Sequence, residues 1–170
     1  MPVPLFDDSL LPRSFVPPVG LRLRPLYNDD FGYLELLEQL TSVGHVSNED
    51  FVQRFDSMKK AASYYVVVLE DVDSSKIVGA ATLVIEFKFI HGAGARGRVE
   101  DVVVDESMRG KKLGVLLNQV LVEMAQKIGV YKLSLECKTD LKPFYNKFGY
   151  SENLHFMVQR FDDSHSVQSK

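Results

Sequence analysis

Two adjacent carboxylates stand at the polar end of a short apolar run in the middle of the chain. Glu100 and Asp101 directly precede three valines, at positions 102 to 104. A carboxylate held beside a buried strand can accept a proton from a nucleophile, which is general-base chemistry. A solvated strand end with no chemical role explains the same residues, and the residues alone favour it. Because adjacent strand residues point to opposite faces, the pair can serve one substrate only if the strand bulges there.

A turn rich in glycine and cations follows a few residues later, over positions 109–114. If a helix begins there, its free backbone N–H groups and its dipole favour an anion such as a pyrophosphate. Solvated lysines in a surface turn explain the run equally well. The P-loop pattern (GxxxxGK, then Ser or Thr) and the dinucleotide pattern GxGxxG are both absent, which excludes those two phosphate sites.

A strand and a helix must position these residues. The segment 98–104 contains a short β-branched run, as a buried strand should. After the turn, apolar residues recur at helical spacing, and Gly129 is placed to end the helix. This apolar stripe consists of Leu113, Leu116, Leu117, Val120, Met124 and Ile128.

The segment upstream predicts two helices and three strands. An edge strand over 21–24 stops at Pro25. Asn28 or Asp29 is expected to cap the first helix, and a capping box over 47–50 begins the second. The first helix is expected to carry an apolar stripe of Phe31, Leu34, Leu37 and Leu40. Strands over 64–69 and 77–90 form a hairpin, so the sheet is at least partly antiparallel, and a glycine-rich loop over 91–97 follows.

The segment downstream predicts three further elements. A strand spans 131–137, and a short helix with Pro143 in its first turn runs from about 141 to 149. A last alternating strand spans 155–161 and is followed by a polar tail.

Composition bounds the class of protein. A chain of 170 residues that is 45% hydrophobic and 25% charged is one ordinary domain with a packed core. Its net charge of -3 argues against a nucleic-acid partner. No apolar run approaches membrane-spanning length, and the start lacks a basic region. The single cysteine, Cys137, cannot form an internal disulfide. We therefore expect a cytoplasmic protein without a membrane span.

Prolines divide the chain into an arm and one domain. Residues 1–20 hold five of the seven prolines and show no periodicity, which predicts an N-terminal arm outside the core. The domain itself is expected over 21–161, with a polar C-terminal tail over 162–170.

Two segments resemble the GCN5-related N-acetyltransferases. The turn that binds coenzyme A in that family has the pattern Gln/Arg-x-x-Gly-x-Gly/Ala. Arg109 and Gly114 match the two ends of this pattern, and Lys112 stands where the middle glycine is usual. The run 142–150 resembles the family's late signature, an aromatic residue and Tyr followed by x-x-x-Gly and an aromatic residue. The resemblance covers about 21 to 161. It implies an α/β fold of the α+β type: a mixed, mostly antiparallel sheet flanked by helices and opened between its fourth and fifth strands, where coenzyme A binds.

The resemblance also implies a reaction. Acetyl-CoA would donate its acetyl group to the amine of glucosamine 6-phosphate, giving N-acetylglucosamine 6-phosphate for UDP-N-acetylglucosamine synthesis. Glu100 and Asp101 would act beside the amine as base and orienting carboxylate. Tyr145 would face the sulfur; since a phenol titrates roughly 1.5 pKa units above a thiol, stabilising the thiolate by a hydrogen bond is as credible as donating a proton. Enzymes of this type are homodimers whose active sites use both subunits.

The same resemblance distributes the binding residues. Besides Tyr145, acetyl-CoA would contact Val102, Val103, Val104, Arg109, Gly110, Lys111, Lys112, Leu113, Gly114 and Val115. The sugar phosphate would contact Thr41, Lys88, Phe89, Ile90, His91, Glu100, Asp101, Val102, Glu136 and Arg160. His91 and Cys137 show no ligand spacing, so no metal is expected.

Two alternatives remain open. An acetyltransferase for another small amine or for a protein N-terminus would keep the turn and Tyr145 but lack a phosphate site. A non-catalytic acetyl-CoA-binding module would keep the turn without turnover.

Overall fold

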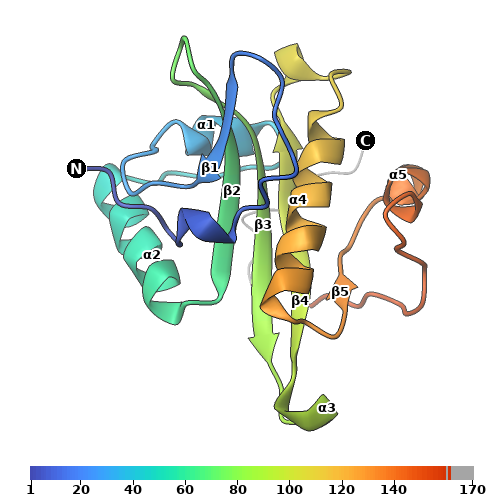
Figure 1. Cartoon of the computed structure of the whole chain (residues 1–170). Coiled ribbons are helices and arrows are strands. Elements are labelled where there is room, and N and C mark those ends of the chain that lie inside the picture. The colour runs from blue at the N-terminus through green and yellow to red at the C-terminus, as the bar shows by residue number, and fades with distance from the viewer. Residues whose placement is uncertain (160, 162–170) are drawn as a thin grey trace. The chain divides into compact units, whose positions relative to one another are not determined.

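The computed structural model of the protein describes residues 1–159 and 161. The chain divides into two compact units, Met1–Leu135 and Glu136–Lys170, and each is described by itself. The first unit holds a five-stranded sheet (Figure 1) made of β1 (Leu21–Pro25), β2 (Tyr64–Asp71), β3 (Ile77–Phe87), β4 (Ala95–Val104) and β5 (Leu133–Ser134). The strands lie side by side in chain order, antiparallel except for the parallel pair β4 and β5. This mixed, mostly antiparallel sheet confirms the predicted fold class.

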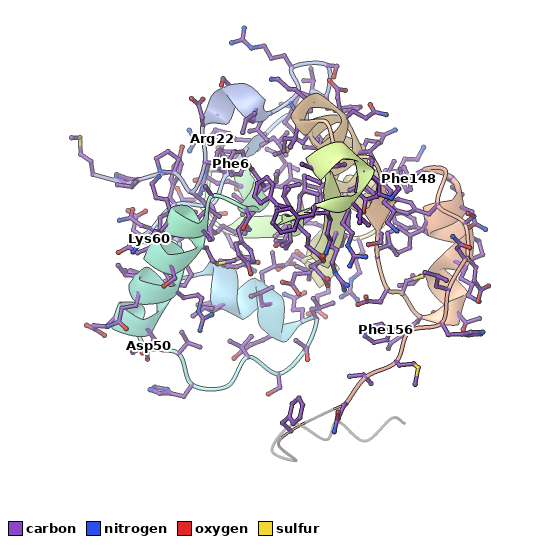
Figure 2. All side chains as sticks on the ribbon, turned by 90° about the horizontal axis from the view of Figure 1, so that it is seen from below. Phe6, Arg22, Asp50, Lys60, Phe148 and Phe156 are labelled. Carbon is purple, nitrogen blue, oxygen red and sulfur yellow. The ribbon has the colours of Figure 1, made fainter. Side chains whose placement is uncertain are left out.

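Helices cover both faces of this sheet. On one face α4 (Leu113–Ile128) packs against β3 and β4, and on the other α1 (Tyr33–Glu38) packs against the same strands (Figures 1 and 2). The longer α2 (Asn48–Ala61) packs against β2. The remaining helices of the first unit are short: η1 (Asp8–Leu10), α3 (Ile90–Ala93) and η2 (Glu106–Met108). The second unit contains η3 (Thr139–Leu141) and α5 (Lys142–Asn146). Within the described residues, no helix combines the length and apolar character needed to cross a bilayer.

The core explains why β2 lacks polar alternation. Its residues 66 to 69 are at most 1% exposed, because both faces of the strand are covered. From the predicted stripe of α4, Leu113, Leu117, Val120 and Met124 are at most 1% exposed, and Leu121, which the stripe did not include, is fully buried as well. Gly129 ends this helix in the left-handed conformation, with φ 87°, which confirms its predicted role. The capping box between Ser47 and Asp50 at the start of α2 is also formed.

One glycine sets the spacing between β4 and β5. Gly97 pairs with Leu133 across the parallel ladder. A Cβ atom on Gly97 would lie 2.5 Å from Cδ2 of Leu133 and 3.1 Å from Cδ1 of Leu83. Any side chain here would therefore force the Leu133 side chain, or β5 itself, to shift.

The N-terminal arm packs more closely than its prolines suggest. Leu5, Phe6 and Leu11 are buried in the core of the first unit, so the prediction that the arm lies outside the core was wrong for these residues (Phe6 is labelled in Figure 2). Polar contacts fasten the arm to α4: Lys127 Nζ donates to the Ser9 carbonyl at 2.6 Å, and Ser14 Oγ donates to the Glu123 carboxylate at 3.0 Å. The arm's boundaries as a separate region stay a prediction.

The first helix begins later than predicted. Neither Asn28 nor Asp29 caps it; the N-cap residue is Gly32. Asp30 is the reason, because its carboxylate accepts hydrogen bonds from the Tyr27 N–H and from the guanidinium of the buried Arg24. Those bonds hold residues 27–30 in a turn. As a result α1 buries Tyr33 and Leu36, while Leu40 of the predicted stripe is 45% exposed.

Strand predictions were also too long at three points. The segment 131–137 forms a strand over two residues, β5, and β3 ends at Phe87. The predicted loop 91–97 is divided between α3 and the start of β4. The predicted last strand, 155–161, is absent from its described residues, 155–159 and 161, all of which are exposed. A strand needs a hydrogen-bonding neighbour, and alternating apolar residues alone do not supply one. The short helix with Pro143 in its first turn is present as α5, but it ends at Asn146 and not near residue 149.

Candidate active site

The two adjacent carboxylates lie at a β-bulge in β4. Ala80 pairs with Val103 and Thr82 with Glu100, so Asp101 and Val102 together face the single residue Ala81. Asp101 adopts a left-handed conformation, φ 51°, which aspartate tolerates better than most residues. The bulge is the condition under which both carboxylates can serve one substrate.

The bulge shifts the alternation of β4 by one residue. Before it, Val99 pairs with Leu83; after it, Val104 pairs with Gly79. These partners lie on the same face of β3 as each other, the face that packs against Leu117 of α4. Thus an odd-numbered residue faces α4 before the bulge and an even-numbered residue faces it afterwards.

Both carboxylates lie toward the face that α1 covers. Thr82, opposite Glu100, lies close to the buried Tyr33, and the negative charge of Asp101 also acts on the Tyr33 hydroxyl. Burial, reinforced by that charge, raises the pKa of the Tyr33 hydroxyl, so it stays protonated.

The two carboxylates have different surroundings. Glu100 accepts from the Arg98 guanidinium, with Arg98 Nε 2.9 Å from Oε1. Neighbouring protein atoms partly remove water from the Asp101 carboxylate, which raises its pKa, and the negative charge of Glu100 raises that pKa further. Asp101 nevertheless remains exposed at its surface. Asp101 therefore has a raised affinity for a proton in a position that a substrate can reach.

The predicted turn leads directly into α4. Gly110 and Lys112 both adopt left-handed conformations, with φ 81° and 61°, and α4 begins at Leu113. The Leu116 N–H bonds to the Lys112 carbonyl, so the N–H groups of the preceding three residues belong to the first helical turn and have no partner within the helix. Lys112 stands where a glycine would be free of strain.

The sheet opens beside the bulge. β5 pairs with β4 at Gly97 and Arg98, whereas β4 continues to Val104. On this edge, the backbone of residues 102–104 is without a β5 partner. Unpaired strand N–H groups of this kind are donors for a carbonyl oxygen or an amide. The expected opening between the fourth and fifth strands is present in the first unit.

Tyr145 belongs to the second unit. It lies on α5 and is 8% exposed, with its ring 4.9 Å from Phe144 and 6.0 Å from Tyr150. Burial raises the pKa of the Tyr145 hydroxyl, and the nearby Cys137 raises it further. Its phenol is therefore a hydrogen-bond donor rather than an anion at neutral pH.

Within the first unit, the residues at positions 88–91 that are expected to bind the sugar phosphate lie away from the two carboxylates. Lys88 to His91 lie at the far end of the β3–β4 hairpin, where Lys88 Nζ is 2.7 Å from Glu86 Oε2 and Phe89 is fully exposed. Thr82 is the strand partner of Glu100, and Lys88 follows Thr82 by six residues. At the usual rise of a strand, Lys88 is therefore about 20 Å from Thr82. Thr41 is exposed after α1, and Glu136 is exposed in the second unit. Arg160 lies outside the described residues.

Three site neighbours carried no signal in the sequence. Tyr33 beside Asp101 was not predicted, nor were Gln39 and Lys76, which contact Asp105 at the end of β4. Each comes from an element far away in the chain, and a hydrogen bond over such a separation leaves no local pattern. Among the described residues, no group of three or more His, Cys, Asp or Glu side chains is arranged to hold a metal ion.

Comparison with known proteins gives concordant results. Residues 22–150 match the model of the family described as "Acetyltransferase (GNAT) family". The Drosophila melanogaster protein named "Probable glucosamine 6-phosphate N-acetyltransferase" is 44% identical, over 96% of this chain and 84% of that protein. The Arabidopsis thaliana "Glucosamine 6-phosphate N-acetyltransferase" is 39% identical, over 77% of this chain and 89% of that protein.

A solved structure is similar as well. The crystal structure of glucosamine-6-phosphate N-acetyltransferase from Arabidopsis thaliana superimposes with a TM-score of 0.80 at 36% identity, covering 84% of this chain and 99% of that one. The family match, the sequence identity and the shared fold agree with the opened sheet and the turn before α4. The chain therefore belongs to the acetyltransferase (GNAT) family, in the group of the glucosamine 6-phosphate N-acetyltransferases.

Proposed function

We propose that the protein transfers the acetyl group of acetyl-CoA to the amine of D-glucosamine 6-phosphate, giving N-acetylglucosamine 6-phosphate for UDP-N-acetylglucosamine synthesis. The bulge at Asp101 is the observation that carries the proposal, because it turns two carboxylates toward one face beside an open strand edge. The names of the relatives supply the acceptor.

Asp101 is the general base in this proposal. The acceptor amine must lose a proton before it can attack the thioester, and a base works best when its pKa approaches the working pH. Asp101 is favoured over Glu100 because the Arg98 guanidinium holds Glu100 in an ion pair, with 2.8 Å between Arg98 Nη2 and Glu100 Oε1, whereas burial raises the pKa of Asp101. Glu100 then orients the amine or a water molecule that relays the proton.

The open edge of β4 and the turn before α4 hold acetyl-CoA. Backbone N–H groups of residues 102–104 suit the thioester carbonyl, where negative charge develops during attack, and the pantetheine arm. The N–H groups of residues 113–115, in the first turn of α4, suit the pyrophosphate, with Arg109, Lys111 and Lys112 nearby. No metal takes part.

Tyr145 stabilises the departing thiolate. Its protonated phenol can donate a hydrogen bond to sulfur, and its raised pKa makes full proton transfer more difficult. Stabilisation by a hydrogen bond is therefore the favoured role.

The phosphate site is completed by a second subunit. The hairpin end at Lys88 lies about 20 Å along β3 from the strand position opposite Glu100, which supports a contribution from another chain. In a homodimer, residues 88–91 of one chain can reach the carboxylates of the other. Thr41, Glu136 and Arg160 are assigned to the same sugar-phosphate site, and the enzyme is expected in the cytoplasm.

A thiol-release assay tests this function. Purified protein is mixed with acetyl-CoA and either glucosamine 6-phosphate, glucosamine, a polyamine or a peptide with a free N-terminus. We expect release with glucosamine 6-phosphate at least tenfold faster than with any other amine. Faster turnover of a different amine would overturn the acceptor, and binding of acetyl-CoA without turnover of any amine would overturn the catalytic role.

A further inference from the structure

The loop that joins β4 to the acetyl-CoA turn begins at a buried carboxylate. Asp105 is 3% exposed, and its two oxygens accept hydrogen bonds from four donors. Oδ1 accepts from the N–H of Ser107 at 3.0 Å and from the Ser107 hydroxyl. Oδ2 accepts from Lys76 Nζ at 3.0 Å and from Gln39 Nε2 at 3.1 Å. These donors, the Ser107 hydroxyl first, hold the pKa of Asp105 well below its usual value, so it is charged at neutral pH.

Gln39 contacts the loop with both ends of its amide. While Nε2 donates to Asp105, Oε1 accepts from the backbone N–H of Glu106 at 2.9 Å. Using both atoms fixes the rotation of the amide and ties the end of α1 to the first residue of η2. Gln39 itself is exposed at the end of α1, so its removal leaves no cavity in the core.

The opposite end of α1 contacts the acceptor side of the site. Tyr33, the first residue of the helix, is buried against Thr82 and close to Asp101. One short helix thus touches the carboxylate pair at its start and the loop before the acetyl-CoA turn at its end.

The loop has few other restraints. The Asp105 N–H bonds to the Val78 carbonyl and the Met108 N–H bonds to the Asp105 carbonyl. Within the loop, the Arg109 N–H bonds to the Glu106 carbonyl at 3.4 Å, and Met108 packs against the core. The chain then passes through two left-handed residues, Gly110 and Lys112, before α4 begins. The direction in which the loop leaves β4 therefore depends strongly on Asp105 and Gln39.

We propose that Gln39 and Asp105 are positioning residues for acetyl-CoA. They hold the segment 106–112 so that the first-turn N–H groups of α4 face the pyrophosphate, at a fixed place relative to Asp101. The inference rests on the proposed acetyl-CoA site and concerns residues that do not touch the ligand.

The experiment compares Gln39→Ala with a matched control, Glu38→Ala, which changes the neighbouring exposed side chain of the same helix. Calorimetry gives the Kd of acetyl-CoA in the absence of an amine. Steady-state assays give separate KM values for acetyl-CoA and glucosamine 6-phosphate. Amide hydrogen exchange reports the opening of residues 106–112, and thermal unfolding reports global stability.

We expect Gln39→Ala to weaken acetyl-CoA binding about three- to tenfold, the effect of losing hydrogen bonds that orient a ligand-binding loop. The KM for glucosamine 6-phosphate should stay within about twofold, and exchange should quicken in 106–112 but not in α2. Gln39→Glu keeps the acceptor for the Glu106 N–H but sets a second negative charge against Asp105, so it should weaken binding at least as much.

Unchanged acetyl-CoA affinity in Gln39→Ala would overturn the proposal. A loss of affinity matched by Glu38→Ala, or accompanied by equal loss for the sugar phosphate and a lower Tm, would overturn it in favour of general destabilisation. If the unaltered protein fails to bind acetyl-CoA, the proposed function fails and this inference falls with it. If it binds acetyl-CoA and turns over a different amine, the acceptor fails while the calorimetry still decides this inference.

Discussion

The two ends of β4 hold carboxylates in opposite electrostatic settings. Near the start of the strand, Glu86 of β3 accepts from Arg96 and lies 2.7 Å from Lys88 Nζ; these cations, Arg96 first, lower the pKa of Glu86 to about 2. Near the end, desolvation and the charge of Glu100 raise the pKa of Asp101. The first end is also where β5 pairs closely at Gly97, whereas the second has no β5 partner. By our proposal, the β3–β4 pair is structural at the end that holds Glu86 and reactive at the end that holds Asp101, and these are called the structural end and the reactive end below.

The largest expected effect is at the reactive end. Asp101→Asn preserves the side-chain shape and, like aspartate, asparagine tolerates φ 51°, but it cannot accept a proton. We expect kcat to fall by about a hundredfold or more, the usual contribution of a general base. Because the raised pKa of Asp101 disfavours its charged form, the variant should be no less stable at pH 7.

Assays of kcat with saturating substrates and a thermal melt test this prediction together. A kcat within threefold of the unaltered enzyme would remove Asp101 from the role of base. Glu100→Gln is the matched variant, and it should retain more activity.

The next effect is at the structural end. Gly97→Val places a side chain against Leu133 and Leu83 and should destabilise the fold by about 1–3 kcal/mol through overpacking. Denaturant unfolding measures the free energy. We expect kcat per folded molecule to change far less than in Asp101→Asn, and a loss of activity without a loss of stability would contradict the division between the two ends.

The third effect is a pH dependence with opposite signs at the two ends. Glu86 has a lowered pKa, so its contribution to stability is present above about pH 4.5 and is lost as the pH falls toward about 2. Glu86→Gln should therefore be less stable than the unaltered protein at pH 7, by less than about 1 kcal/mol. The difference should vanish near pH 2.

Asp101 shows the reverse. Its pKa is raised, so its stabilising contribution is present while it is protonated and is lost as the pH rises above 3.8. As the pH rises above 3.8, Asp101→Asn should therefore become more stable relative to the unaltered protein. Melting curves from pH 2 to 7 for both variants measure the two trends, and parallel curves would disprove the contrast.

The smallest effect is expected just beyond the reactive end, in the turn before α4. Lys112→Gly relieves a left-handed non-glycine residue, which costs about 1–3 kcal/mol, but glycine also loses about 0.5–1 kcal/mol of chain entropy on folding. We expect a slightly higher Tm and an acetyl-CoA KM within about twofold. A large loss of affinity would mean that the lysine side chain, and not the backbone N–H, binds the phosphate.

Local patterns predicted the strand–turn–helix segment because its determinants are neighbours in the chain. The β-branched run of β4, the apolar stripe of α4 and the glycine that ends it each act within a few residues. The sequence could say only that both carboxylates would share a face if the strand bulged. Whether it bulges depends on the register of β4 against β3, which the sequence of β4 alone does not reveal.

Non-local contacts explain the errors. Arg24 donates a hydrogen bond to the Asp30 carboxylate, and this contact keeps the residues before α1 in a turn, so the helix begins later in the chain than predicted. Leu5 and Phe6 are buried by partners far along the chain, so the prolines around them misled the prediction about the arm. The bond between Gln39 and Asp105 joins residues 66 positions apart and could not be predicted from spacing.

The bulge has a consequence for reading genomes. A homologue with one residue fewer between the positions of Val99 and Val103 would regain a regular pleat, and its two acidic residues could no longer share a face. On the mechanism proposed above, such a chain would keep the sheet, the helix and the turn before α4 but would lose the base that deprotonates the amine. A single-residue gap at this point is therefore the change in a homologue that we expect to abolish acetyl transfer while leaving the fold intact.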